Sequence, residues 1–283
     1  VMAITGTNGK TTTTALLGAI MGDYHPESFV VGNIGIPYTD VVLDQTQDSV
    51  TVAEISSFQL ETIDTFHPKV SAITNISEDH LNRHHTMEEY IRVKELIASN
   101  QTADDYCILN YEDDVLRPFG ETIIPKVIYF SSLRPLDKGI YLDEGKIVYK
   151  DEQGSIEVTK TSDLKLLGLH NYENVMTAVA MAYCAGVPMD SIRKTIQNFA
   201  GVEHRIEYVT EKKGVAYYND SKGTNPDAAI KGIQAMNRPT LLIGGGYDKA
   251  SEYKDWINAF DGKVRYLVLI GQTREKIADT AIS

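Results

Sequence analysis

Apolar runs alternate with longer amphipathic stretches along most of this chain. Runs rich in β-branched and apolar residues predict strands at residues 1–5, 28–31, 50–54, 69–76, 105–110 and 126–130. Apolar positions that recur every three or four residues predict helices at 12–21, 86–98, 170–182 and 189–199. This alternation of strands and helices is typical of an α/β fold with a mainly parallel sheet.

The pattern changes after residue 138. Residues 139–149 alternate around a turn, and residues 155–158 follow with the same period of two. This period favours antiparallel hairpins over crossover units. We expect them to form a small antiparallel region that covers one edge of the sheet and carries little chemistry.

A domain boundary is expected near Gly201, where the last of these helices has ended. Beyond it, strands are predicted at 206–209, 214–218, 239–246 and 264–271, with helices at 226–236 and 253–260. We therefore expect domains at 1–201 and 202–283, the second a partial, doubly wound, Rossmann-like α/β unit. Because residue 1 lies within a predicted strand and the sequence ends just after a strand and a partial helix, an internal piece of a longer protein is expected.

Composition narrows the class of protein. The 283 residues are 42% hydrophobic and 23% charged, as in ordinary soluble proteins, and no apolar run reaches the ~18 residues of a membrane span. The net charge of −12, with no Lys/Arg cluster, argues against nucleic-acid binding. Cys107 and Cys184 lie in apolar runs, which predicts buried free thiols in a reducing cytoplasm.

The first strand ends in a glycine-framed turn that is typical of a phosphate-binding loop. Its glycines let backbone N–H groups face a phosphate, Lys10 can reach the terminal phosphates, and Thr11 can ligate Mg²⁺. The spacing is a shortened variant of the usual P-loop, but the strand before it and the helix after it are the expected context. The predicted loop and helix start comprise Gly6, Thr7, Asn8, Gly9, Lys10, Thr11 and Thr12.

Polar residues stand at the ends of three predicted strands. Glu54 follows a buried strand and is a candidate Mg²⁺ ligand, or else a solvent-exposed acid or a helix N-terminal acid. Asn33 lies between glycines, where an asparagine also suits a tight turn. His80, beside Asp79, can bind a metal or polarise a carbonyl, whereas His84 and His85 are predicted to lie on the surface.

A lysine interrupts an apolar helical stripe. Lys94 shares a face with Tyr90, Ile91 and Ile97 in a helix predicted to start at the Thr86 cap. Its ammonium could extend past the stripe to solvent, or it could be held near the phosphate site, with or without modification. The pattern leaves both interpretations open.

Later polar clusters add candidate ligand contacts. Asn171, predicted as a helix cap, and Asn174 could read an adenine edge. The segments 219–226 and 244–249 follow predicted strands, at the edge where open α/β sheets bind ligands, although either could be a solvated turn.

Taken together, these motifs resemble those of the ATP-dependent Mur ligases of peptidoglycan synthesis. The shared motifs, in family order, are GTNGKTT at 6–12, GNIGIP at 32–37, EISSFQLE at 54–61, TNISEDHL at 74–81, YIRVKELI at 90–97, HNYENV at 170–175, EHRIE at 203–207 and NDSKGTNPDA at 219–228. EISSFQLE and NDSKGTN point to the branch that adds D-glutamate, rather than to its siblings or to folylpolyglutamate synthase.

The resemblance implies a central P-loop ATPase domain and a Rossmann-like C-terminal domain, preceded in the family by a UDP-binding domain that we expect to lie outside this sequence. The implied reaction joins D-glutamate to UDP-N-acetylmuramoyl-L-alanine through an acyl phosphate and a tetrahedral intermediate, with release of ADP and phosphate. It also implies a monomeric enzyme of the bacterial cytoplasm, with roles in cell shape and division and with no nucleic-acid or membrane partner.

The resemblance also implies residue roles. Lys10 would contact the β- and γ-phosphates, Thr11 and Glu54 one Mg²⁺, and His80 with a carbamoylated Lys94 a second ion. The muramoyl-alanine would meet Asn33, Ser56 and His80. In the nucleotide, the adenine would contact Asn171 and Asn174. The ribose would contact Asp220, and the γ-phosphate would contact Arg205. The incoming glutamate would meet Lys222, Thr224 and Lys249.

Other functions stay open at this point. A sibling ligase or a folylpolyglutamate-synthase-like enzyme would use another acceptor, and a nucleotide-binding module would carry out no chemistry. The acceptor is the least determined feature, because further contacts to it are expected beyond residue 283.

Overall fold

The chain folds into two compact units in a computed structural model that describes residues 1–224, 226–248 and 251–282. Unit 1 comprises Val1–Lys165 and His170–Phe199, and unit 2 comprises Leu166–Leu169 and Ala200–Ser283. Each unit is an α/β structure, which confirms the predicted fold class. Among the described residues, no helix is both long and apolar enough to cross a membrane.

Unit 1 is built on one nine-stranded sheet with the order β2-β3-β1-β4-β5-β6-β7-β8-β9. Pairing is parallel from β2 to β7 and antiparallel from β7 to β9, so the predicted hairpin region lies at one edge. The strands are β1 (Met2–Thr5), β2 (Ser28–Gly32), β3 (Val50–Glu54), β4 (Val70–Ile73), β5 (Tyr106–Asn110), β6 (Lys126–Ser131), β7 (Gly139–Asp143), β8 (Lys146–Asp151) and β9 (Gly154–Lys160).

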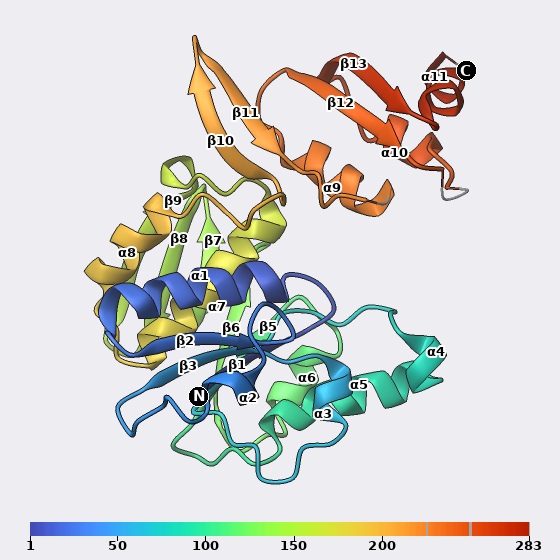
Figure 1. Ribbon diagram of the computed structural model, residues 1–283. Coiled ribbons are helices and arrows are strands. Elements are labelled where there is room, and N and C mark those ends of the chain that lie inside the picture. Colours follow the sequence, from blue (N-terminus) through green and yellow to red (C-terminus); the bar gives the residue numbers. More distant parts are fainter. Residues whose placement is uncertain (225, 249–250, 283) are drawn as a thin grey trace. The chain divides into compact units, whose positions relative to one another are not determined.

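Helices cover both faces of this sheet (Figure 1). On one side lie α1 (Lys10–Tyr24), α7 (Leu169–Cys184) and α8 (Met189–Asn198). On the other lie α2 (Tyr38–Val41), α3 (Ser57–Leu60), α5 (Met87–Glu95) and α6 (Leu116–Gly120), with the short α4 (Leu81–His84) before α5. Because parallel strands need crossover connections, each strand from β1 to β5 is followed by a helix or helical turn.

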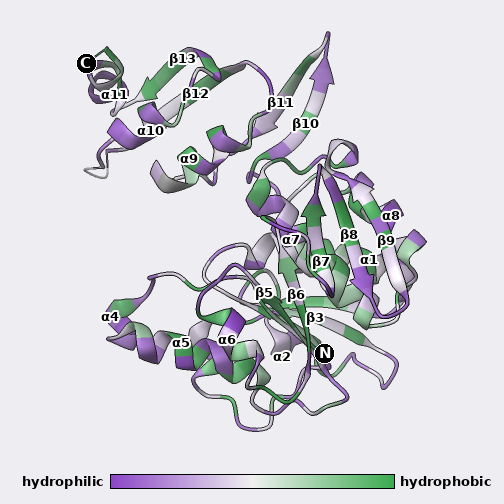
Figure 2. Ribbon diagram, turned by 180° about the vertical axis from the view of Figure 1, so that it is seen from behind, coloured by the Kyte–Doolittle hydropathy of each residue, from purple (hydrophilic) through white to green (hydrophobic). Residues whose placement is uncertain are grey.

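Strand alternation divides the core of unit 1 between the two faces. Ala3, Ala53 and Ile73 pack with Val93 and Ile97 of the α5 region in one buried cluster. Their strand neighbours must point the other way, where α1 contacts β1 and β3. The central strands accordingly carry the hydrophobic colour in Figure 2, whereas many of the surrounding loops are hydrophilic.

Unit 2 contains an antiparallel hairpin and a parallel βα layer. β10 (Glu207–Lys212) pairs antiparallel with β11 (Val215–Asn219), and β12 (Thr240–Gly246) pairs parallel with β13 (Val264–Gly271). The helices are α9 (Pro226–Ala235), α10 (Lys254–Asn258) and α11 (Arg274–Ile282). Strand β13 has the bounds that the sequence predicts, whereas α10 is three residues shorter than predicted.

Two local expectations are wrong. Helix α7 begins at Leu169, so Asn171 lies within its first turn and is not its cap. Cys107 is fully buried as expected, but Cys184, at the end of α7, is only partly buried. Burial raises the pKa of both thiols to about 12, so neither is a reactive thiolate at neutral pH.

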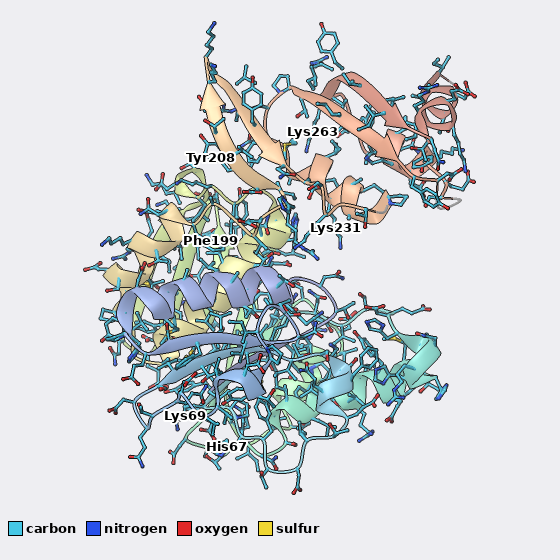
Figure 3. The ribbon with its side chains drawn as sticks, viewed as in Figure 1. His67, Lys69, Phe199, Tyr208, Lys231 and Lys263 are labelled. Carbon is cyan, nitrogen blue, oxygen red and sulfur yellow. The ribbon has the colours of Figure 1, made fainter. Side chains whose placement is uncertain are left out.

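A buried carboxylate joins the N-terminal ends of β4 and β5. Asp105 accepts hydrogen bonds from the backbone and hydroxyl of Thr102, and its oxygens lie 2.6 Å from His67 Nε2 and 3.1 Å from Lys69 Nζ. Figure 3 shows His67 and Lys69 beside one another at this edge. Burial by itself would raise the pKa of Asp105, but these partners outweigh it and hold the pKa well below its usual range.

We predict that Asp105→Asn lowers the free energy of unfolding at pH 7 by about 1–3 kcal/mol, because hydrogen bonds to a charged group are lost. The depressed pKa means that this stabilisation is present above the unfolded carboxyl's pKa and is lost as the pH falls towards the native value. Urea unfolding at pH 7 and pH 3 should show a smaller difference between variant and wild type at pH 3. The exposed neighbour Asp104→Asn is the control, and an equal loss there would contradict the assignment.

Candidate functional site

The turn between β1 and α1 has the backbone geometry of a phosphate loop. Gly6 and Gly9 have φ angles of 140° and 85°, and Gly9 precedes the first turn of α1. A Cβ atom on Gly6 would lie 2.0 Å from Thr74 Oγ1, and one on Gly9 would lie 2.2 Å from Asn174 Oδ1. Both positions therefore require glycine for conformation and for space.

The end of β4 holds this loop in place. Thr7 N donates to Asn75 O, and Asn8 N donates to Asn75 Oδ1, each at 2.9 Å. Thr74 Oγ1 in turn donates to Asn8 O at 2.6 Å. Because these partners directly follow the neighbouring strand of the sheet, the loop shape is set by tertiary contacts as well as by its own glycines.

Two lysine ammonium groups converge on one carbonyl of the loop. Lys10 Nζ donates to Gly6 O at 2.8 Å and to Thr7 O at 2.9 Å. Lys94 Nζ, from α5, donates to the same Gly6 O at 2.8 Å and to Thr5 Oγ1 at 3.1 Å. The loop thus carries two adjacent cationic groups, which suits an anionic ligand.

Lys94 is buried against the loop and does not extend to solvent. Only 2% of the residue is exposed, and its ammonium lies 5.3 Å from the centre of the Tyr90 ring. Burial, and then repulsion from Lys10, lower the pKa of Lys94 to about 7. Of the two interpretations left open by the sequence, the structure supports the lysine held near the loop.

Glu54 ends β3 as a buried carboxylate, not as the solvent-exposed acid of the alternative interpretation. The residue is 1% exposed, and Asn33 Nδ2 donates to its Oε1 at 2.9 Å. Its other oxygen, Oε2, is buried without a hydrogen-bond partner among the described residues. A buried charged oxygen in this state is costly, so the site suits a further cationic partner.

These side chains surround a pocket of about 220 Å³ at the carboxyl end of the sheet. Its lining residues are Lys10, Asn33, Ser56, Ser57, Phe58, His80, Tyr90 and Lys94. The sequence predicted five of them as site residues. It missed Ser57, Phe58 and Tyr90, although the first two belong to the quoted motif at 54–61 and Tyr90 lies one helical turn before Lys94.

His80 and His84 have different surroundings. His80 adopts a left-handed backbone conformation, with φ of 53°, and its half-exposed ring lies 3.4 Å from Asp79 Oδ2. His84 was predicted to lie on the surface, and this is wrong, because only 3% of the residue is exposed. Its ring packs against Phe58 and Tyr90, which the sequence pattern could not show. His85 is exposed as predicted.

Asn171 and Asn174 lie together behind the phosphate loop. Both are buried, Asn174 Nδ2 donates to Asn171 Oδ1 at 3.3 Å, and Asn174 Oδ1 accepts from Thr13 at 3.3 Å. The pair therefore joins α7 to the start of α1. Thr11, on the first turn of α1, is only partly buried, whereas Thr12 is buried.

The remaining candidates belong to unit 2. Asp220 Oδ1 accepts from Ile206 N at 3.0 Å, and burial raises the pKa of this carboxyl. Arg205, Lys222 and Thr224 are exposed around the same turn, where Lys222 N donates to His204 O. Lys249 lies outside the described residues. Across the described ranges, no three His, Cys, Asp or Glu side chains form a group that could hold a metal ion by themselves.

Comparison with known families gives two matches. The family model described as "Mur ligase middle domain" matches residues 4–182, and the one described as "Mur ligase, glutamate ligase domain" matches residues 204–283.

Curated relatives agree with these matches. A UDP-N-acetylmuramoylalanine–D-glutamate ligase of Lachnoclostridium phytofermentans is 61% identical over 281 residues, and one of Lachnospira eligens is 58% identical over 280 residues. Each alignment covers 99% of this chain but 62% of the relative. The chain thus spans less than two thirds of the length of these relatives.

Solved structures share the fold. MurF from Acinetobacter baumannii has a TM-score of 0.70 at 20% identity, over 99% of this chain and 65% of that one. MurC from Thermotoga maritima also has a TM-score of 0.70 at 20% identity, over 98% and 63%. At this identity the likeness shows the fold alone.

We predict that Gly9→Ala abolishes nucleotide binding, because its Cβ would meet Asn174 and displace the loop. Gly186 is the matched control, since it has the same φ of 85° with nothing within 4 Å of an added Cβ. Gly186→Ala should therefore show only the backbone strain, about 1–2 kcal/mol in unfolding free energy. Calorimetric titration with ATP and urea unfolding measure both effects, and unchanged ATP affinity in Gly9→Ala would contradict the assignment.

Proposed function

The chain belongs to the Mur ligase family, and from this membership we propose that the protein is an ATP-dependent, ADP-forming ligase that adds D-glutamate to UDP-N-acetylmuramoyl-L-alanine in peptidoglycan precursor synthesis. The observation that carries the proposal is the pocket lined by Lys10, Lys94, Asn33 and His80. Asn33 also donates a hydrogen bond to the buried carboxylate of Glu54. The identity of the acceptor rests on the names of the similar relatives.

Phosphate binding is assigned to the loop and to the first turn of α1. The N-terminus of this 15-residue helix places the N–H groups of its first turn and the positive end of its dipole at the loop. In the bound state, Lys10 would exchange its bonds to the Gly6 and Thr7 carbonyls for phosphate oxygens. Asn171 and Asn174 would serve the adenine side.

Mg²⁺ fits the residues present. The unpartnered buried oxygen of Glu54 is a hard anionic ligand, and the Thr11 hydroxyl lies on the adjoining turn. Two protein ligands suffice, because Mg²⁺ usually completes its shell with water and substrate phosphates. Bound there, the ion would neutralise charge on the phosphates. We assign His80 and a carbamoylated Lys94 to a second ion.

The proposed reaction has two steps. A carboxylate oxygen of UDP-N-acetylmuramoyl-L-alanine bonds to the γ-phosphorus, and the bond from phosphorus to the departing ADP oxygen breaks. The D-glutamate amine then bonds to the acyl carbon, the carbon–oxygen bond to phosphate breaks, and a proton leaves the nitrogen. Lys10 would stabilise the phosphoryl charge, while Asn33, Ser56 and His80 would orient the muramoyl-alanine.

The unit 2 residues complete the proposal by resemblance. Arg205 is assigned to the γ-phosphate, where an added cation compensates transferred charge, and Asp220 to the ribose. Lys222, Thr224 and Lys249 are assigned to the incoming glutamate. We also propose that the protein is monomeric and cytoplasmic and has no nucleic-acid or membrane partner. The net charge of −12 supports the absence of a nucleic-acid partner.

Carbamate formation at Lys94 can be tested directly. CO₂ adds to a neutral amine, and the pKa of Lys94 near 7 makes the neutral form abundant at pH 7–8, where an ordinary lysine stays protonated. With ¹³C-labelled CO₂ held at a fixed dissolved concentration, we expect a carbamate NMR signal that rises from pH 6 to pH 8. Lys94→Arg should lack the signal and Lys194→Arg, at an exposed position, should keep it. If the carbamate NMR signal is absent from the wild-type protein at pH 8, the carbamate is ruled out.

An acceptor panel tests the function. The complete protein, supplied with ATP, Mg²⁺ and UDP-N-acetylmuramoyl-L-alanine, is expected to release ADP and form the amide product with D-glutamate, as measured by mass spectrometry. We expect less than about 1% of this turnover with L-lysine or meso-diaminopimelate. A site built to hydrogen-bond one substrate discriminates strongly against another that leaves its polar groups without partners. Turnover with either of these instead would indicate a sibling ligase. ATP binding without any acyl phosphate would indicate a nucleotide-binding module.

A further inference from the structure

One wall of the pocket is held by a buried histidine that the proposed mechanism does not use. His84 Nε2 lies 2.9 Å from Ser57 Oγ, and His84 Nδ1 lies 3.2 Å from Glu61 Oε1. Ser57 and His84 are 2% and 3% exposed, respectively. Ser57 also lines the pocket, so this chain of contacts links a pocket hydroxyl to a carboxylate outside it.

The partners of Glu61 decide which way these hydrogen bonds run. Arg83 donates to Glu61 Oε2 at 2.7 Å, and this bond lowers the pKa of Glu61 and keeps the carboxylate ionised. An ionised carboxylate can only accept, so Nδ1 of His84 carries the proton. In the neutral ring, Nε2 then accepts from the Ser57 hydroxyl. The Ser57 proton is thereby directed away from the pocket, and the oxygen lone pairs remain for a ligand.

The same histidine also supports the segment that carries His80. The Phe58 ring lies between the His84 ring, stacked at 5.7 Å with an interplanar angle of 13°, and the His80 ring at 5.0 Å. His80 has a left-handed backbone, which persists in a non-glycine residue only where surrounding contacts maintain it. Phe58 of α3 thus contacts both His84 and His80, so the packing of His84 supports the wall of the pocket next to His80.

We propose that Ser57 accepts a hydrogen bond from an N–H or O–H of the sugar–peptide substrate, and that His84, held by Glu61, is the positioning residue that orients Ser57. This inference rests on the proposed function, because it concerns the same pocket. The side-chain hydrogen bonds described for Ser57 and His84 do not involve the phosphate loop. A change at either residue should therefore affect binding of the sugar–peptide substrate and leave nucleotide binding nearly unchanged.

The test is a double-mutant cycle with His84→Phe and Ser57→Ala. Phenylalanine keeps the ring that packs against Phe58 and removes both hydrogen bonds. We expect each single variant to lower kcat/KM for UDP-N-acetylmuramoyl-L-alanine about tenfold, the worth of one hydrogen bond, with the affinity for ATP changed less than twofold. If His84 acts through Ser57, the double variant should be no worse than Ser57→Ala alone.

Controls separate the possible failures. His85→Asn alters an exposed histidine of the same segment and should match the wild type. Multiplicative losses in the double variant, or wild-type kinetics in Ser57→Ala, would overturn the proposal even if His84→Phe does not fold. A complete wild-type protein that makes no product would instead overturn the proposed function. The ring ¹⁵N shifts of His84 provide a readout without turnover, and a proton on Nε2 with none on Nδ1 would also overturn the proposal.

Discussion

The candidate site of unit 1 is organised around a buried ammonium beneath a glycine turn. Lys94 of α5 donates to the Gly6 carbonyl, and Lys10 of α1 donates to the same oxygen. Two cations at this distance repel, and burial adds a desolvation cost, which together lower the pKa of Lys94. Such an arrangement is unfavourable for the fold alone, and either a bound anion or conversion of Lys94 to the proposed carbamate would relieve it. The pocket is therefore organised for negative charge, although the whole chain is acidic.

The parallel sheet explains why the polar groups gather at one place. β1, β3 and β4 are neighbours, so the phosphate loop, Glu54 and the segment after Ile73 emerge at the same edge. Asn33 reaches this edge from the end of β2 and binds Glu54. Each strand supplies one chemical group, and no single loop contains the site. This is the usual position of ligands in open α/β sheets, and its reason is the common direction of the strands.

Much of the fold follows from patterns of short range. The strand runs, the helical apolar stripes and the glycine-framed turn are local signals, and the structure has these elements within a few residues of the predicted bounds. Site residues that carry their own chemistry, such as Lys10, Glu54 and His80, could also be identified, because few other reasons place such groups at strand ends. No such sequence signal identifies Ser57, Phe58 or Tyr90, because serines and aromatic rings are common in any helix or core.

The sequence by itself determined the fold class, the glycine-framed turn and the family, because these depend on the order and spacing of residues along the chain. Only the tertiary structure decided where the side chains of Lys94, His84 and Asn174 are buried. A lysine within an apolar stripe, such as Lys94, can be buried or can extend to solvent, and His84 belongs to a polar segment that was predicted to lie on the surface. Asn174 lies behind a loop more than 160 residues earlier. Their positions depend on contacts across the sheet and between helices, and the energy of burying a polar group is set by those partners.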